Sequence, residues 1–204
     1  MIKLRAFFLS LVLVILTLLF INQTYVKNIE DYYKVNDNSI RYGTSYEKYK
    51  SKDILANNIT PNTLVLLGSS ELVATKDQAY HPNRIFNYSD FNIMQIGTSY
   101  SQNIVQASTL GSIESAMTKR KVAIIESVQW YEKNGIHQDA FLNKASQEHI
   151  FNTLANEKIS KETKEKLINR VIEITKGNKQ QNDIYKKIKE VFVENKGNIL
   201  EKNL

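Results

Sequence analysis

The chain has 204 residues, of which 42% are hydrophobic and 24% charged, a composition typical of a globular domain with a real core. Cysteine is absent, which excludes disulfides, thiolate metal sites and a cysteine nucleophile. The formal net charge of +6 suits anionic partners, but the lysines are scattered and no finger or RNA-binding motif accompanies them, so we expect no nucleic-acid partner.

The first 26 residues have the pattern of a membrane anchor. Lys3 and Arg5 precede an uncharged stretch, "AFFLSLVLVILTLLFI" at 6–21, which is slightly shorter than the roughly 20 residues that span a bilayer, and the flanking side-chain stems supply the difference. A cleaved signal peptide is the alternative, but the following "FINQTYVKN" contains no small-x-small cleavage site. We therefore expect an uncleaved single-pass anchor at 1–26 in the cell membrane, with its N-terminus cytoplasmic and the remainder extracellular.

Residues 27–62 are polar and rich in tyrosine, and we interpret them as a stalk or linker that docks on the domain. Apolar residues recur only loosely at helical spacing, around Ile54 and Leu55. The "TPNT" at 60–63 interrupts this pattern because it contains proline. The folded domain is expected to occupy 63–204.

This domain opens with a strand–helix–strand pattern. Three apolar runs predict buried strands: "TLVLLG" at 63–68, "FNIMQIG" at 91–97 and "KVAIIES" at 121–127. Between the second and third runs, 101–117 carries an apolar stripe at helical spacing. The fold class is therefore expected to be α/β, a parallel sheet with flanking helices, together with one N-terminal transmembrane helix.

The remaining residues have helical patterns. One helix is expected within 139–156, and a second within 160–177, where Ser160 is a capping candidate and Gly177 a stop signal. A further helix is expected within 182–197.

Polar residues follow each of the three predicted strands, where open α/β sheets bind their ligands. Ser70 lies in "GSSE" after the first strand, Gly97 ends the second, and Gln129 follows the third. A serine hydroxyl presented by a tight turn is a candidate nucleophile, while backbone N–H groups and an amide side chain can hold an oxyanion. The alternatives are that Ser70 only caps a helix, that Gly97 is a turn glycine and that Gln129 is an ordinary polar residue. The α/β-hydrolase elbow G-x-S-x-G is not present at this site.

Four segments occur in an order that resembles the DltD family: "LGSSEL" at 67–72, "HP" at 81–82, "QIGTSYSQ" at 95–102 and "SVQWYEKNGI" at 127–136. The family comprises membrane-anchored proteins needed to put D-alanine on lipoteichoic acid, and its fold is similar to that of the SGNH, or GDSL, hydrolases. The resemblance covers the anchor and the first half of the soluble domain. It implies an incomplete SGNH-like domain, and we interpret the chain as a fragment ended early at Leu204.

The resemblance also implies roles for individual residues. Ser70 aligns with the SGNH nucleophile, Gly97 with the glycine that donates its N–H to the oxyanion, and Gln129 with the side-chain donor of the third block. The hydrolases take their base from an Asp-x-x-His motif, which this sequence lacks. Of the three histidines, we interpret His81 as part of a structural turn with Pro82, and the other two, at positions 137 and 149, as surface or packing residues. We therefore expect an inactive form.

Two functions from different classes remain open. The first is serine-dependent D-alanyl transfer, or ester or thioester cleavage, outside the cytoplasm; by resemblance its partners are a membrane-bound O-acyltransferase, the D-alanyl carrier protein and lipoteichoic acid, and no metal or organic cofactor is implied. The second is a non-catalytic, membrane-anchored binding or scaffold protein of the cell envelope, in which the "GSSE" turn holds an anion at a helix N-terminus.

Overall fold

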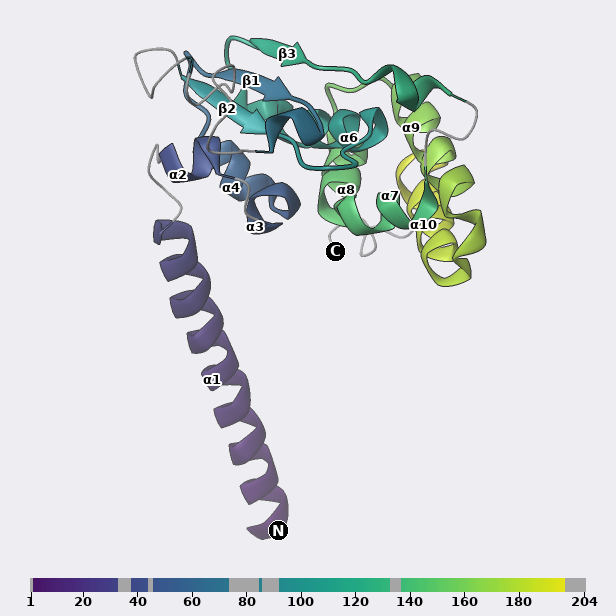
Figure 1. Cartoon of the computed structure of the whole chain (residues 1–204). Helices are drawn as coiled ribbons and strands as arrows, with labels where there is room; N and C mark the ends of the chain where they lie inside the picture. The colour runs from purple at the N-terminus through teal and green to yellow at the C-terminus, as the bar shows by residue number, and fades with distance from the viewer. Residues whose placement is uncertain are drawn as a thin grey trace. The chain divides into compact units, whose positions relative to one another are not determined.

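A computed structural model of the chain describes residues 2–32, 38–43, 46–73, 85, 92–132 and 137–196. The chain divides into two compact units, Met1–Val35 and Asn36–Leu204 (Figure 1). The first unit contains α1 (Ile2–Tyr32), and its segment Arg5–Tyr25, with a mean hydropathy of 2.3, is long and apolar enough to cross a membrane. At 1.5 Å per residue, such a segment measures about 30 Å, the thickness of the hydrocarbon core of a bilayer.

The second unit is an α/β domain, as predicted. Its strands are β1 (Leu64–Leu67), β2 (Ile93–Ile96) and β3 (Val122–Ile124). Its helices are α2 (Asn38–Tyr42), α3 (Tyr46–Lys50), α4 (Lys52–Asn57), α6 (Asn103–Ile113), α7 (Gln138–Lys144), α8 (Gln147–Ala155), α9 (Lys161–Ile174) and α10 (Lys179–Phe192). Short 3-10 turns are η1 (Ser70–Leu72), η2 (Glu114–Ala116), η3 (Val128–Tyr131) and η4 (Thr175–Gly177).

The three strands form a parallel sheet in the order β2–β1–β3. Leu64 pairs with Ile93 and Val65 with Val122, so the central strand is the one that precedes the "GSSE" segment. Each predicted apolar run contains its strand, which confirms the parallel α/β class.

Two apolar clusters hold this unit together. The sheet cluster joins β1 and β2 to helices α4 and α6, which cover one face of the sheet; its buried members are Leu55, Val65, Leu67, Met94, Ile96, Ile113 and Met117. The helical cluster joins α6 to the carboxyl-terminal helices, with α6 and α8 lying side by side (Figure 1). Because Leu55 of α4 is fully buried in the sheet cluster, part of the segment interpreted as a stalk packs within the domain.

The carboxyl-terminal helices follow the predicted pattern with one difference. The stretch 139–156 is not one helix, because the chain breaks between α7 and α8. There the Ser146 hydroxyl donates to the Lys50 carbonyl at 2.9 Å and accepts the N–H of His149 at 3.3 Å, so it caps α8. Ser160 caps α9 as predicted, accepting the N–H of Thr163 at 3.2 Å.

Candidate active site at the carboxyl ends of the strands

Each of the three predicted site residues follows a strand of the parallel sheet. Ser70 follows the central strand, Gly97 follows β2 and Gln129 follows β3, so all three lie beyond the carboxyl ends of parallel strands. Backbone hydrogen bonds continue past the strands on both sides of β1. The N–H of Gly68 donates to Ile96 at 3.1 Å, and that of Ile125 donates to Leu67 at 2.8 Å.

Ser70 is the exposed residue of the serine pair. It begins the 3-10 turn η1, and Ser69 occupies the position before it. Ser69 is buried, its hydroxyl donates to the Thr98 carbonyl at 3.4 Å, and its N–H donates to the Glu71 carboxylate at 2.6 Å. Ser70 therefore is not a helix cap in this structure, and its hydroxyl makes no hydrogen bond to any residue of the described ranges. Ser70 is therefore accessible to solvent, as a nucleophile requires.

Gly97 lies against the glycine that opens this turn. A Cβ atom at position 97 would lie 2.8 Å from the Gly68 carbonyl oxygen and 2.8 Å from Cδ1 of Leu72. A larger residue would force the two strand ends apart, so the close approach requires glycine. Gly97 therefore lies against the start of the turn that contains Ser70.

Gln129 is exposed within η3, and its amide makes no hydrogen bond among the parts of the chain that the structure describes. The next residue, Trp130, is buried and fixes the turn. Ser70 and Gln129 thus follow β1 and β3 with exposed side chains that make no hydrogen bond within the described ranges.

Two buried glutamines, which were not among the predicted site residues, donate hydrogen bonds to backbone carbonyls of the turn after β1. The Gln106 amide donates to the carbonyls of Gly68, at 3.0 Å, and Ser101, at 3.2 Å, and so ties α6 to the turn. The Gln95 amide crosses from β2 and donates to the carbonyl of Leu72 at 2.5 Å. Both side chains are buried. In the sequence, each is a polar residue within an apolar strand or helix stripe, and this is the feature that could have identified them.

Two adjacent residues of helix α3, Lys48 and Tyr49, donate hydrogen bonds to backbone carbonyls on the outer edge of β2. The buried Lys48 amine donates to the carbonyls of Gln95, at 2.5 Å, and of Arg41 and Gly43, both at 3.0 Å. The Tyr49 hydroxyl donates to the carbonyl of Gly97 at 2.8 Å. Burial lowers the pKa of Lys48 to about 7 and raises the pKa of Tyr49 to about 12. Sequence reasoning missed both, because they lie in a polar segment 47 and 48 positions from their partners.

Neither of the two described histidines is hydrogen-bonded to Ser70. His81 lies outside the described residues, and His137 is exposed before α7. His149 is buried, with Nδ1 2.6 Å from the Ser112 hydroxyl oxygen and Nε2 3.2 Å from the carbonyl of Tyr49. Burial lowers the pKa of His149 to about 4, so the ring is neutral at pH 7. Both residues were interpreted as surface or packing residues, and His137 lies at the surface while His149 packs in the interior. Within the described ranges, no group of three or more metal-ligating side chains gathers.

Comparison with known proteins identifies the family. The profile of the family described as "DltD protein" matches residues 41–203, which include all three site residues. Protein DltD of Bacillus subtilis (strain 168) is 26% identical over 114 residues, covering 55% of this chain and 29% of the relative. The aligned part thus spans less than a third of the length of that relative. Because the family profile matches well over half of the sequence, the chain belongs to the DltD family.

Proposed function

We propose that this chain acts in the D-alanylation of lipoteichoic acid as a membrane-anchored protein, with Ser70 as the nucleophile of a D-alanyl transfer. Family membership supports the process. The single observation that supports the chemistry is the exposed Ser70 in the turn that follows the central strand of the sheet.

In the proposed step, Oγ of Ser70 attacks the carbonyl carbon of a D-alanyl ester or thioester. The Ser70 proton passes to a base and then to the departing alcohol or thiol, leaving a D-alanyl ester on the serine. A hydroxyl of lipoteichoic acid then attacks this ester, and Ser70 takes back a proton. The N–H groups of Ser70 and Gly97 and the amide of Gln129 are the proposed donors to the oxyanion in both steps.

The proposed location is the outer surface of the cell membrane. The apolar segment Arg5–Tyr25 in α1 is consistent with a single-pass anchor, and Lys3 and Arg5 at its start favour a cytoplasmic N-terminus. The +6 net charge suits an anionic polymer as acceptor. A membrane-bound O-acyltransferase and the D-alanyl carrier protein are the partners proposed from the family resemblance.

A chromosomal Ser70→Ala substitution in the native host tests the proposal, with the D-alanyl ester content of lipoteichoic acid as the readout. We expect Ser70→Ala to abolish esterification. The matched control is Ser69→Ala, which removes a buried hydroxyl with one long hydrogen bond and should leave part of the ester content.

A non-catalytic scaffold is the second candidate function, and the observation that favours it is that neither described histidine is hydrogen-bonded to Ser70. Unchanged ester content in Ser70→Ala cells, with loss of esters only when the whole protein is deleted, would establish the scaffold and remove the nucleophile.

A further inference from the structure

The amino-terminal ends of α8 and α10 meet at one cavity of about 460 Å³. Ser146 and Gln147 line it from the start of α8, and Asn178 and Gln181 line it from the start of α10. The Gln147 amide donates to the side-chain oxygen of Gln181 at 2.7 Å, so the two helix ends are directly linked. Because the first N–H groups of a helix carry partial positive charge, two such ends at one cavity favour an anion.

Two amide side chains of the cavity have their oxygens engaged and their nitrogens available. Oδ1 of Asn178 accepts the backbone N–H of Gln181 at 3.1 Å, and Oε1 of Gln181 accepts the Gln147 amide at 2.7 Å. These contacts fix the orientation of both amides. Neither of the two amide nitrogens donates to a residue of the described ranges. The start of α10 thus presents hydrogen-bond donors, and a ligand for them has to be an acceptor.

Tyr185 adds a buried hydroxyl to these donors. The residue is 2% exposed and lines the cavity, and its hydroxyl makes no hydrogen bond in the part of the chain that the structure describes. Tyr185 lies one turn beyond Gln181 on the same face of α10, and helical side chains lean toward the amino terminus, so its side chain is directed to the cavity. Burial raises the pKa of Tyr185 to about 12, so the hydroxyl keeps its proton at neutral pH. Buried hydroxyls are nearly always paired, so this one points to a ligand.

Lys50, at the end of α3, brings a formal positive charge to the lining. Its ammonium donates to the carbonyl of Ala145, and its own carbonyl accepts the Ser146 hydroxyl at 2.9 Å, so it is held at the start of α8. Burial and the nearby charge of Lys144 lower the pKa of Lys50, so its charged form gains from an anion beside it. No carboxylate is among the described residues that line the cavity.

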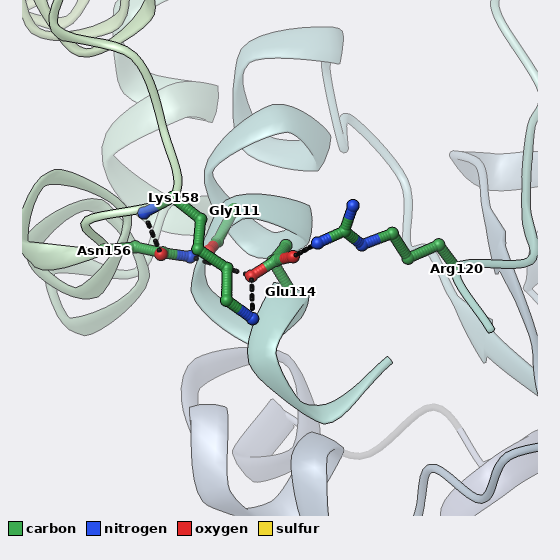
Figure 2. A network of polar contacts seen from close by, with 5 residues as sticks. All are labelled: Gly111, Glu114, Arg120, Asn156 and Lys158. Atoms are coloured by element: carbon green, nitrogen blue, oxygen red, sulfur yellow. Dashed lines mark hydrogen bonds and ion pairs between the residues drawn. The ribbon is translucent and has the colours of Figure 1, made fainter. Parts of the chain in front are cut away.

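A second basic cluster, at the end of α6, has its acceptors within the protein, as Figure 2 shows. The Glu114 carboxylate lies 2.5 Å from Arg120 and 3.4 Å from Lys158. The Asn156 amide nitrogen donates to the Gly111 carbonyl at 3.1 Å, while its oxygen accepts the N–H of Lys158 at 3.0 Å. This cluster therefore links its elements without needing a ligand, unlike the donors around Tyr185.

We propose that the cavity between the amino-terminal ends of α8 and α10 binds a small phosphate monoester through the Tyr185 hydroxyl, the amides of Asn178 and Gln181, and the Lys50 ammonium. A phosphate monoester has three terminal oxygens, one for each of the three neutral donors, and carries close to two negative charges at neutral pH. A carboxylate or a phosphodiester has only two such oxygens and one charge. The volume is within the range of small-molecule sites, so the ester can carry a small organic group. The inference goes beyond the proposed function and does not depend on Ser70 chemistry.

Isothermal titration calorimetry of the full chain in non-ionic detergent micelles tests the inference. The probes are ethyl phosphate, a monoester, and its isomer dimethyl phosphate, a diester. We expect ethyl phosphate to bind with a Kd of about 1 mM or lower, and dimethyl phosphate to bind at least about tenfold more weakly. Tyr185→Phe removes the hydroxyl and keeps the ring, so it should weaken ethyl phosphate binding by at least about tenfold, the scale of a hydrogen bond to a charged group.

A pair of lysine substitutions separates the site from the general positive charge of the chain. Lys50→Gln should weaken ethyl phosphate binding by at least about tenfold. The matched control is Lys186→Gln, which removes an exposed charge from α10 outside the lining and should leave the affinity unchanged. Thermal unfolding of each variant verifies the fold, and Tyr185→Phe decides the matter if Lys50→Gln does not fold.

Four results would overturn the inference. The first is that ethyl phosphate does not bind, and the second is that Tyr185→Phe binds it as tightly as the unchanged chain does. The third is an equal loss in Lys50→Gln and Lys186→Gln, which would assign the binding to general charge. The fourth is equal affinity for dimethyl phosphate, which would assign the cavity to phosphodiesters, such as those of lipid headgroups and polymers.

Discussion

Replacing Gly97 with alanine tests how closely the two loops of the candidate site pack. The added Cβ atom would lie 2.8 Å from the carbonyl oxygen of Gly68. This oxygen belongs to the backbone and accepts the Gln106 amide at 3.0 Å, so it cannot rotate away as a side chain could. The methyl group therefore has to push apart the ends of β1 and β2, between which the Ser70 turn begins.

The expected cost follows from this geometry. Overpacking by one methyl group in a rigid site destabilises by about 1–3 kcal/mol. In a domain of roughly 150–250 residues, each kcal/mol lowers Tm by about 2–4 °C. We therefore expect Gly97→Ala to lose about 2 kcal/mol and to lower Tm by about 4–8 °C, measured on the full chain in detergent micelles by circular dichroism.

A second glycine provides the matched control. A Cβ atom at Gly177 would lie 2.6 Å from the Gln138 side-chain oxygen, which is the far end of a flexible, partly exposed side chain. That side chain can move aside, so Gly177→Ala should cost a fraction of the loss at Gly97. Equal melting temperatures for the two variants would refute the claim that the β1 and β2 loops are in rigid contact.

Four further outcomes are expected. Gln129→Ala should lower the rate of D-alanylation by about 100-fold, the scale of one oxyanion donor, without lowering Tm; an unchanged rate would remove Gln129 from the site. Because the folded-state pKa of His149 is lowered to about 4, the unfolded chain binds its proton first as pH falls below about 6.5, so stability should fall by about 3 kcal/mol between pH 6.5 and 4. Denaturant titrations should show a smaller pH dependence for His149→Gln, and an identical one would contradict this assignment. Protease added to protoplasts should remove the domain, and complete protection or a mature N-terminus near residue 25 would contradict the anchor. Expressed alone in a strain without its own DltD, the chain should leave lipoteichoic acid unesterified, since no Asp-x-x-His is present; full esterification would show that one of its histidines or a group of a partner in that strain serves as the base, and loss of esters on replacing a histidine would identify the former.

The sequence predicted the sheet, and which residues follow its strands, because both depend on local pattern. Apolar runs that stop at glycine marked β1 and β2, and the parallel order then brought the following residues, Ser70 and Gly97, to one edge. The buried side chains that hydrogen-bond to that edge, such as Lys48, could not be predicted in the same way. Lys48 lies in a polar segment whose pattern favours solvent, and its burial depends on carbonyls up to 47 positions away. Long-range burial of a polar side chain leaves no periodic signal, because it depends on which acceptors the fold brings near.

The structure contains a hydrogen-bonded serine–histidine pair, Ser112 and His149, but this pair is not suited to acyl transfer. Ser112 and His149 are hydrogen-bonded, but both are buried, and the second ring nitrogen is engaged by the carbonyl of Tyr49. Ser112 is also six residues beyond Gln106 on α6, about 9 Å farther along the helix from the Ser70 turn. The pair therefore links α3, α6 and α8 as a packing contact. Ser70 has the opposite property: it is exposed, and no histidine of the described ranges is bonded to it. The proposed chemistry consequently requires a base from outside the described residues, either His81 or a group delivered by a partner.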